Sequence, residues 1–280
     1  MKKKTEAKVL SQKMIATNIY DLWLETDIAK DAHAGQFIGV YTNDKSAILP
    51  RPISICEVSD DRKSLRLVYR VAGKGTGNIS ELKAGDNVEV IGVLGYGYDL
   101  DKILKNKEVQ GDCQKEAAVA KTSVILMGGG IGIPPMLQLA KELCAQGINP
   151  TIIVGYRDSE MYLNQDLAKY GTVEIATEDG SVGTKGNVLN VVNNKNLTPE
   201  VIMACGPMPM LRAIKNFAAA QTDAGKATKA FISLEERMAC GVGACLGCVC
   251  KTKEIDHHSH VNNARICTDG PVFDAEDVDI

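Results

Sequence analysis

The chemically most suggestive part of the sequence is a group of closely spaced cysteines. The stretch MACGVGACLGCVC places Cys240, Cys245, Cys248 and Cys250 within eleven residues. The first three follow the pattern C-x4-C-x2-C, which is typical of plant-type [2Fe–2S] sites whose fourth cysteine comes from a separate segment. Cys267, in RICTDG, is expected at a strand end before a turn, where it could close such a site. We therefore predict that the first three cysteines and Cys267 are ligands and that Cys250 is not.

A structural zinc site is the simplest alternative for these cysteines. Zinc ribbons more often use two C-x2-C pairs, and only one such pair is present here. The run HHSH adds His257, His258 and His260, and histidine clusters can bind metals. Because this run has no apolar neighbours, we interpret it as a solvated loop.

Near the beginning of the chain, two segments could hold one long ligand. In an extended RPIS strand, Arg51 and Ser54 lie about 10 Å apart, so one strand can offer a cation to a phosphate and a hydroxyl to a ring system. The later run VYRVAGKGTG supplies an aromatic ring at Tyr69 and hydrogen-bond donors at Gly75 and Thr76. Each segment alone is also compatible with a solvated strand, but their combination favours a binding site.

Two further segments pass from an apolar strand into a helix. The turn GGGIGIPP can present backbone N–H groups and a helix dipole to a pyrophosphate. It departs from the G-x-G-x-x-G pattern, because the third glycine position falls on Ile133 or Pro135. A tight turn without a ligand is the alternative. CGPMPM has the same strand-to-helix character, and alone it indicates only a turn.

The elements around these motifs fall into three zones. Short alternating runs such as SLRLVYRV are typical of a small antiparallel barrel. Strands such as PTIIVGYR then alternate with helices such as PPMLQLAKELCAQG, which indicates a doubly wound parallel sheet. We predict a multi-domain β plus α/β fold with an N-terminal antiparallel β-barrel domain (residues 1–105), a doubly wound parallel α/β domain (106–225) and a small C-terminal [2Fe–2S] domain (226–280).

Composition narrows the functional classes. The chain has 280 residues, of which 45% are hydrophobic, as expected for a globular protein. A formal net charge of −3 argues against general affinity for nucleic acid or for an anionic membrane. No apolar run approaches the roughly 20 residues of a membrane span. Nine cysteines, an odd number and clustered toward the end, argue against a secreted disulfide scaffold and favour a cytoplasmic protein. The scattered cysteines are expected to be buried: Cys56, Cys113, Cys144 and Cys205.

Taken in order, RPIS, GGGIGIPP and CGP resemble the ferredoxin–NADP reductase family, in which the barrel holds FAD and the α/β domain a pyridine nucleotide. With SLEERMACGVGACLGCVC and ARICTDGPVF added, nearly the whole chain resembles the iron–sulfur electron-transfer subunits of dihydroorotate dehydrogenase B. The resemblance implies that FAD contacts Arg51, Pro52, Ile53, Ser54, Val68, Tyr69, Arg70, Gly75 and Thr76. It implies that NAD faces Gly128, Gly129, Gly130, Gly132, Cys205, Gly206 and Pro207, with Glu178 and Asp179 as weaker candidates.

The resemblance also implies an oxidoreductase that routes electrons. A separate FMN-containing catalytic subunit would oxidise dihydroorotate in pyrimidine biosynthesis, and electrons would pass through [2Fe–2S] and FAD to NAD⁺. The expected assembly is a heterotetramer with two copies of each subunit. Ser54 would lie near the reactive edge of the flavin and Cys205 near the nicotinamide, without an assigned acid–base role.

Two alternatives remain open from the sequence. One is an NAD(P)H-linked flavoprotein subunit of another complex, such as a sulfide dehydrogenase, a ferredoxin-dependent transhydrogenase or a hydrogenase diaphorase. The transhydrogenase type resembles this chain less, because it replaces one cluster cysteine with aspartate. The other is a non-enzymatic adaptor whose cysteines bind structural zinc, which would be colourless where flavin and cluster are brown-yellow.

Overall fold

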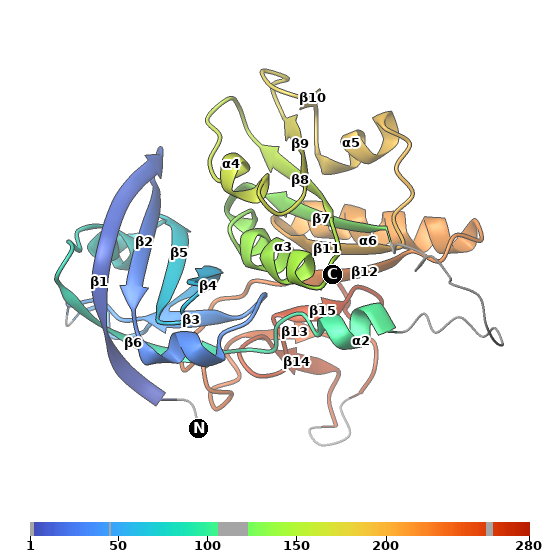
Figure 1. Cartoon of the computed structure of the whole chain (residues 1–280). Helices are drawn as coiled ribbons and strands as arrows, with labels where there is room; N and C mark the ends of the chain where they lie inside the picture. Colours follow the sequence, from blue (N-terminus) through green and yellow to red (C-terminus); the bar gives the residue numbers. More distant parts are fainter. Residues whose placement is uncertain (1–2, 45, 106–122, 256–259) are drawn as a thin grey trace, which may run out of the picture.

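The computed structural model describes residues 3–44, 46–105, 123–255 and 260–280, and it contains the three predicted parts (Figure 1). The barrel lies on one side, the α/β sheet with its helices on the other, and the C-terminal segment lies against both. The predicted fold class is confirmed.

The N-terminal part is a closed antiparallel barrel with the strand order β1-β2-β5-β4-β3-β6. Side chains alternate between the inside and the solvent. In β6, for example, Val88 and Val90 are buried whereas Asn87 and Glu89 are exposed. The strands are β1 (Lys3–Ala16), β2 (Ile19–Glu25), β3 (Phe37–Val40), β4 (Arg51–Val58), β5 (Ser64–Arg70) and β6 (Asn87–Leu94). The short helices of this part are η1 (Asp27–Asp31) and α1 (Lys74–Ser80), whereas α2 (Leu100–Lys105) lies beside the sheet of the second part (Figure 1).

The second part is a seven-stranded sheet with the order β10-β9-β8-β7-β11-β12-β15, in which only β15 runs antiparallel to its neighbour. Its strands are β7 (Val124–Gly129), β8 (Thr151–Tyr156), β9 (Thr172–Thr177), β10 (Thr184–Lys185), β11 (Val201–Cys205), β12 (Lys229–Ser233) and β15 (Val272–Asp274). Its helices are η2 (Gly130–Gly132), α3 (Pro135–Ala145), α4 (Asn164–Leu167), α5 (Val188–Asn194) and α6 (Met208–Asp223). The strand order reverses between β7 and β11, which is where doubly wound sheets bind ligands.

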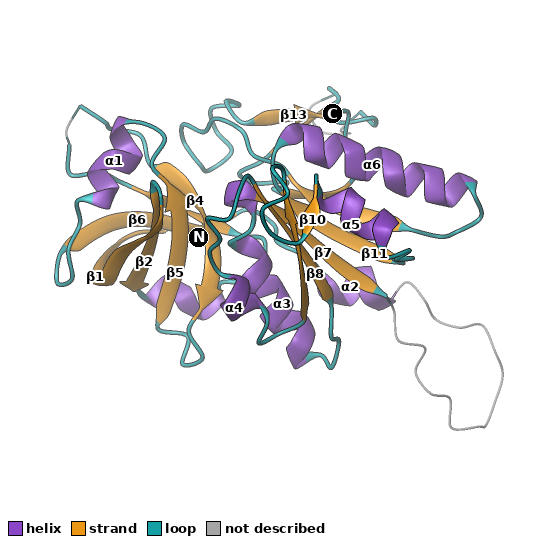
Figure 2. Ribbon diagram, turned by 90° about the horizontal axis from the view of Figure 1, so that it is seen from above, coloured by secondary structure: helices purple, strands orange, loops and turns teal. Residues whose placement is uncertain are grey.

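Helices cover both faces of this sheet (Figure 2). Alternate residues of β7 explain this, because Leu126 packs in the core on the α3 side while Met127 packs in the core with α5 and α6. A strand buried on both faces reads as a continuous apolar run, as VILM does. Helix α3 ends at Ala145, and Gly147 follows it at φ +77°, a left-handed conformation that glycine adopts readily after a helix.

The C-terminal segment is not an appendage. It forms a hairpin of β13 (Val249–Lys251) and β14 (Asn263–Arg265) and then returns as β15 to the edge of the sheet. Strands β12 and β15 both lie beyond residue 225, so the sheet takes two strands from the region assigned by sequence to the C-terminal domain. The domain boundaries stay predictions, and the one at residue 105 borders residues outside the described part.

The scattered cysteines behave differently from one another. Cys56 and Cys205 are fully buried, as predicted. Cys144 is exposed near the end of α3, so the prediction was wrong there, because the residue falls on the solvent side of an amphipathic helix. Cys113 lies outside the described residues. In the described part of the chain, no helix combines the length and the apolar character needed to cross a membrane.

Candidate functional site

A cavity of about 570 Å³ opens where the barrel, the sheet and the C-terminal segment meet. The strands β4 and β5 contribute one wall. The GGGIGIPP turn after β7, called here the glycine loop, contributes Ile131, and the C-terminal segment contributes Ile266 and Pro271. Seven of the nine residues expected around FAD line it: Pro52, Ile53, Ser54, Val68, Tyr69, Arg70 and Thr76. Residues far apart in sequence therefore line one cavity, and their contact with FAD stays a prediction.

The other two expected residues, Arg51 and Gly75, contact each other beside the cavity. A Cβ atom on Gly75 would lie only 1.9 Å from Nε of Arg51, so glycine is required for the guanidinium to cross this position. The Nη1 group of Arg51 also donates a hydrogen bond to the carbonyl of Leu49 at 2.6 Å. The hydroxyl of Thr76 accepts the N–H of Ala72 at 2.9 Å and so closes the turn that leads into α1. These contacts fit a fixed cation beside a phosphate.

Tyr69 is mainly a core residue. Only 2% of its surface is exposed, and its hydroxyl donates to Oε1 of Gln12 at 3.0 Å. Its ring stacks on that of Tyr20 with a centroid distance of 5.9 Å, and burial raises the pKa of the phenol. It borders the cavity, but the broad aromatic face expected from the sequence is largely used by the barrel.

The sequence interpretation missed one wall of the cavity. The segment from Ser233, the last residue of β12, to Glu236 lines it together with Met238, before the first cluster cysteine. Glu235 is exposed, but the surrounding protein partly desolvates its carboxyl and raises the pKa, an effect that the nearby Arg70 guanidinium opposes. In the sequence, the SLEE motif supported only the family resemblance. Its position at the cavity depends on β12 joining the sheet, which the sequence alone does not reveal.

The two predicted nucleotide motifs touch each other at the carboxyl ends of adjacent strands. Gly128 of β7 pairs with Cys205 of β11, and a Cβ atom on Gly132 would lie 2.3 Å from the Cys205 carbonyl oxygen. Gly130 has φ +51° and no atom within 4 Å of the position of a Cβ, so a ligand can approach its backbone. This cradle at the switch point fits a dinucleotide.

The remaining nucleotide candidates differ in accessibility. The Cys205 side chain is fully buried, and burial, followed by the charge of Glu235, raises the pKa of its thiol. Glu178 and Asp179 are exposed after β9, at the same edge of the sheet. The hydroxyl and N–H of Ser181 donate to the Asp179 carboxylate and lower its pKa.

The four predicted ligand cysteines come together in two pairs. The thiol of Cys240 interacts with that of Cys245, and the thiol of Cys267 interacts with that of Cys248. Burial opposes ionisation of the Cys240 thiol. Hydrogen bonds from N–H groups of the loop and from the Cys245 side chain outweigh burial and lower the pKa of Cys240 to about 6. One of these donors is the N–H of Val242, whose nitrogen lies 3.4 Å from the Cys240 sulfur. A low thiol pKa favours the thiolate that binds iron.

Glycines give the cysteine loop its shape. Gly241 and Gly243 have φ of +68° and +85°, which lets the loop turn its N–H groups inward. Thiols that meet in two pairs suit a two-iron cluster, because its ligands are divided between two metal atoms. The residues present therefore fit a [2Fe–2S] group.

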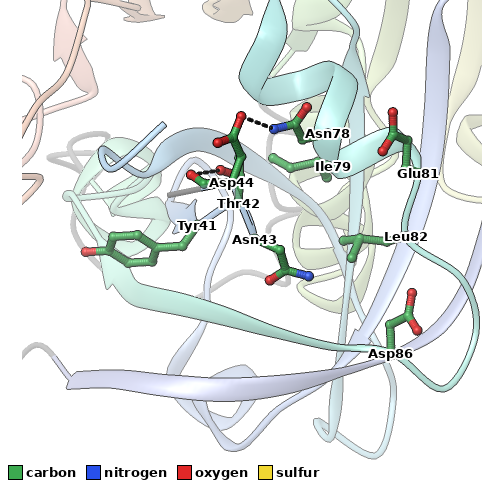
Figure 3. A pocket seen from close by; sticks show the side chains of 9 residues that line it. All are labelled: Tyr41, Thr42, Asn43, Asp44, Asn78, Ile79, Glu81, Leu82 and Asp86. Atoms are coloured by element: carbon green, nitrogen blue, oxygen red, sulfur yellow. Dashed lines mark hydrogen bonds between the residues drawn. The ribbon is translucent and has the colours of Figure 1, made fainter. Parts of the chain in front are cut away.

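Residues outside this set occupy other places. Cys250 lies in β13 opposite Ala264, and burial raises the pKa of its thiol to about 11. His260 is exposed, whereas His257 and His258 lie outside the described residues. A second cavity of about 470 Å³ lies on the barrel between the chain after β3 and α1 (Figure 3). Its Asp44 carboxylate already pairs with Lys74 and Asn78, and none of the predicted site residues lines it.

Comparison with known proteins covers up to 99% of the chain. Residues 235–279 match the model of the iron–sulfur cluster binding domain of dihydroorotate dehydrogenase B. The chain is 39% identical over 277 residues to the dihydroorotate dehydrogenase B (NAD(+)) electron transfer subunit of Listeria monocytogenes serotype 4b, covering 99% of both chains. It is 37% identical over 268 residues to the subunit of the same name from Streptococcus mutans, covering 95% of this chain and 94% of the relative.

Solved structures agree on the fold. An NADH-dependent reduced ferredoxin-NADP oxidoreductase aligns with a TM-score of 0.78 and 24% identity, over 98% of this chain and 89% of that chain. At this identity the likeness concerns the fold alone.

Proposed function

The chain belongs to the family of dihydroorotate dehydrogenase B electron-transfer subunits, and we propose that it passes electrons from a catalytic partner subunit to NAD⁺. One observation carries the proposal: a single cavity is bordered by the expected flavin residues, the glycine loop and the residues beside Cys267. Full-length relatives with this name favour it over a sulfide dehydrogenase, transhydrogenase, diaphorase or zinc adaptor subunit.

In this proposal the chain positions its cofactors rather than reacting itself. Arg51 neutralises the FAD pyrophosphate, and Ser54 hydrogen-bonds at the ring system. A bound flavin supplies the ability to take up single electrons and to exchange a hydride with nicotinamide. Ile266 and Pro271, on either side of Cys267 in sequence, hold the cluster segment against the flavin cavity.

The nucleotide side uses backbone more than side chains. Gly130 leaves room for the NAD pyrophosphate, and the Gly132–Cys205 contact holds the two motifs together beneath it. Since burial raises the pKa of Cys205, its thiol stays neutral at pH 7 and serves to shape the nicotinamide site. We assign it no proton transfer.

The pyrimidine chemistry belongs to the partner in this proposal. The sequence offers a path for hydride but no recognisable site for a pyrimidine ring. The partner would be an FMN-containing catalytic subunit, joined in a heterotetramer with two copies of each chain, and the pathway would be pyrimidine biosynthesis. We propose a cytoplasmic location because the nine cysteines, an odd number clustered toward the end of the sequence, argue against a secreted disulfide scaffold.

The test uses the full-length chain purified without its partner. We expect one FAD and one [2Fe–2S] cluster per chain, and oxidation of NADH with an artificial electron acceptor. Dihydroorotate should not be turned over until the catalytic subunit is added. Turnover of dihydroorotate by the single chain, or a colourless zinc protein, would contradict the proposal.

A further inference from the structure

The segment Gly95–Tyr98, which follows β6 and is called here the junction segment, contacts all three parts of the fold. On the barrel side, the side-chain amide of Gln36 donates to the Gly95 carbonyl at 2.9 Å. The N–H of Tyr98 donates to the Ala34 carbonyl at 3.0 Å. A Cβ atom on Gly97 would lie 2.0 Å from that same carbonyl oxygen, so the segment lies directly on the barrel loop before β3.

The same segment contacts the turn that follows the cluster ligand Cys267. The N–H of Tyr96 donates to the Gly270 carbonyl at 2.5 Å. A Cβ atom on Gly95 would lie 2.6 Å from Cδ of Pro271, a residue that lines the flavin cavity. The position of the cluster turn relative to the cavity therefore depends on this backbone.

The third contact reaches the nucleotide site through the side chain of Tyr98. The residue is 5% exposed, and its hydroxyl donates to the Ala204 carbonyl at 3.3 Å, one residue before Cys205. A Cβ atom on Gly35 would lie 2.8 Å from the Tyr98 ring and 2.9 Å from Val272, so the ring is wedged between barrel and C-terminal segment. Its hydroxyl extends to β11, and Tyr98 shares a buried cluster with Met203 and Cys205 of that strand.

We propose that Tyr98 is a positioning residue that sets the distance between the nicotinamide site at the end of β11 and the flavin cavity. The inference rests on the proposed function, since it assumes hydride transfer between these two sites. The physical basis is the hydrogen bond from the Tyr98 hydroxyl to β11. Because the Tyr98 ring is fixed on the barrel, this bond fixes the end of β11, which leads into Cys205 and Gly206. A shift of about 1 Å at the reacting atoms is enough to slow a transfer strongly.

The test compares Tyr98→Phe with the control Tyr96→Phe in the full-length, flavin-loaded chain. Both changes remove one phenolic hydroxyl, but the Tyr96 side chain is 71% exposed and only its backbone holds the cluster turn. For Tyr98→Phe we expect about three- to tenfold slower flavin reduction by NADH in stopped flow, as expected for loss of one hydrogen bond. The KM for NADH should stay unchanged, because the glycine loop is intact.

Two readouts do not depend on turnover. The long-wavelength absorbance of stacked nicotinamide and flavin should weaken in Tyr98→Phe. The backbone amides of residues 201–206 should exchange hydrogen faster in the protein without NADH. Tyr96→Phe should match the unchanged chain in both.

The outcomes separate this proposal from the one it rests on. An unchanged chain that binds no flavin or does not oxidise NADH would refute the proposed function itself. If that chain is active and Tyr98→Phe equals it in rate, absorbance and exchange, the positioning role is wrong. Loss of flavin, cluster or thermal stability in Tyr98→Phe, without slower transfer in the remaining loaded protein, would show a purely structural role and overturn the proposal as well.

Discussion

Arg66 and Asp21 form a bidentate ion pair, with Nε–Oδ1 and Nη2–Oδ2 distances of 3.0 and 2.9 Å. Asp21 is 2% exposed and Arg66 is 9% exposed, so both charges are withdrawn from water. The remaining nitrogen of Arg66 reaches Glu57 at 3.2 Å and Asp166 of α4 at 3.0 Å. The guanidinium of Arg66, which is fixed in the barrel wall, thereby forms an ion pair with α4 of the α/β part.

The link to Asp166 predicts a pH-dependent stability. Burial would raise the pKa of this carboxyl, but Lys169 and Arg66 outweigh burial and lower it. The native carboxylate therefore stabilises the fold above the unfolded pKa of about 3.9, and this contribution is lost as pH falls through the lower native value. We expect Asp166→Asn to lower stability by about 1 kcal/mol at pH 7. Thermal unfolding of both proteins should show the difference narrowing below about pH 4, and a constant difference would refute this.

Arg51→Ala should weaken FAD retention. The pyrophosphate loses a charge-assisted hydrogen bond worth roughly 1.5–3 kcal/mol, which is about ten- to hundredfold in affinity. Flavin per protein after gel filtration is the measurement. Lys63→Ala is the control, because this exposed residue lies in the turn beyond the other end of β4. Equal flavin content in both variants would argue against a phosphate contact at Arg51.

Gly132→Ala should damage the nucleotide site and spare the flavin site. The added Cβ would lie 2.3 Å from the Cys205 carbonyl oxygen, so the glycine loop and β11 must separate. Such overpacking costs about 1–3 kcal/mol. We expect a higher KM for NADH with an unchanged flavin content. Steady-state kinetics with an artificial acceptor measures the KM for NADH, and flavin absorbance measures the flavin content. A normal KM would show that the nucleotide site does not require contact between the two motifs.

Two cysteine variants test the ligand assignment. Cys267→Ser should lose or greatly weaken the iron–sulfur absorbance, because its thiol lies next to that of Cys248. Cys250→Ser should keep the absorbance, because Cys250 lies in the β13–β14 hairpin opposite Ala264. Iron content and visible spectra decide between them. The reverse pattern would make Cys250 the fourth ligand.

Local signals explain which elements the sequence could predict. The apolar run of β7, the glycines after it and the proline that opens α3 are consecutive, so one short window contains a strand, a turn and a helix start. The cysteine spacing was similarly informative, because three of the four proposed ligands share one loop.

The rest depends on contacts between distant residues. β15 is only three residues long, and its Val272 pairs with Ser233, which no local pattern could reveal. Glu235 follows β12, and its position at the cavity depends on β12 joining the sheet, which is why that wall was missed. Tyr69 illustrates another limit of the sequence. Alternation predicts that neighbouring residues of a strand face opposite sides, but it does not predict which side becomes the barrel interior, so the burial of Tyr69 was not foreseen.

The position of β15 also has a consequence for biosynthesis. During translation, β12 is complete about forty residues before Val272–Asp274 emerges, and until then one side of β12 lacks its strand partner. An unpaired strand edge next to a large apolar surface is prone to pair with other chains. A chain stalled or cleaved within the cysteine region should therefore aggregate, because the edge of β12 stays unpaired.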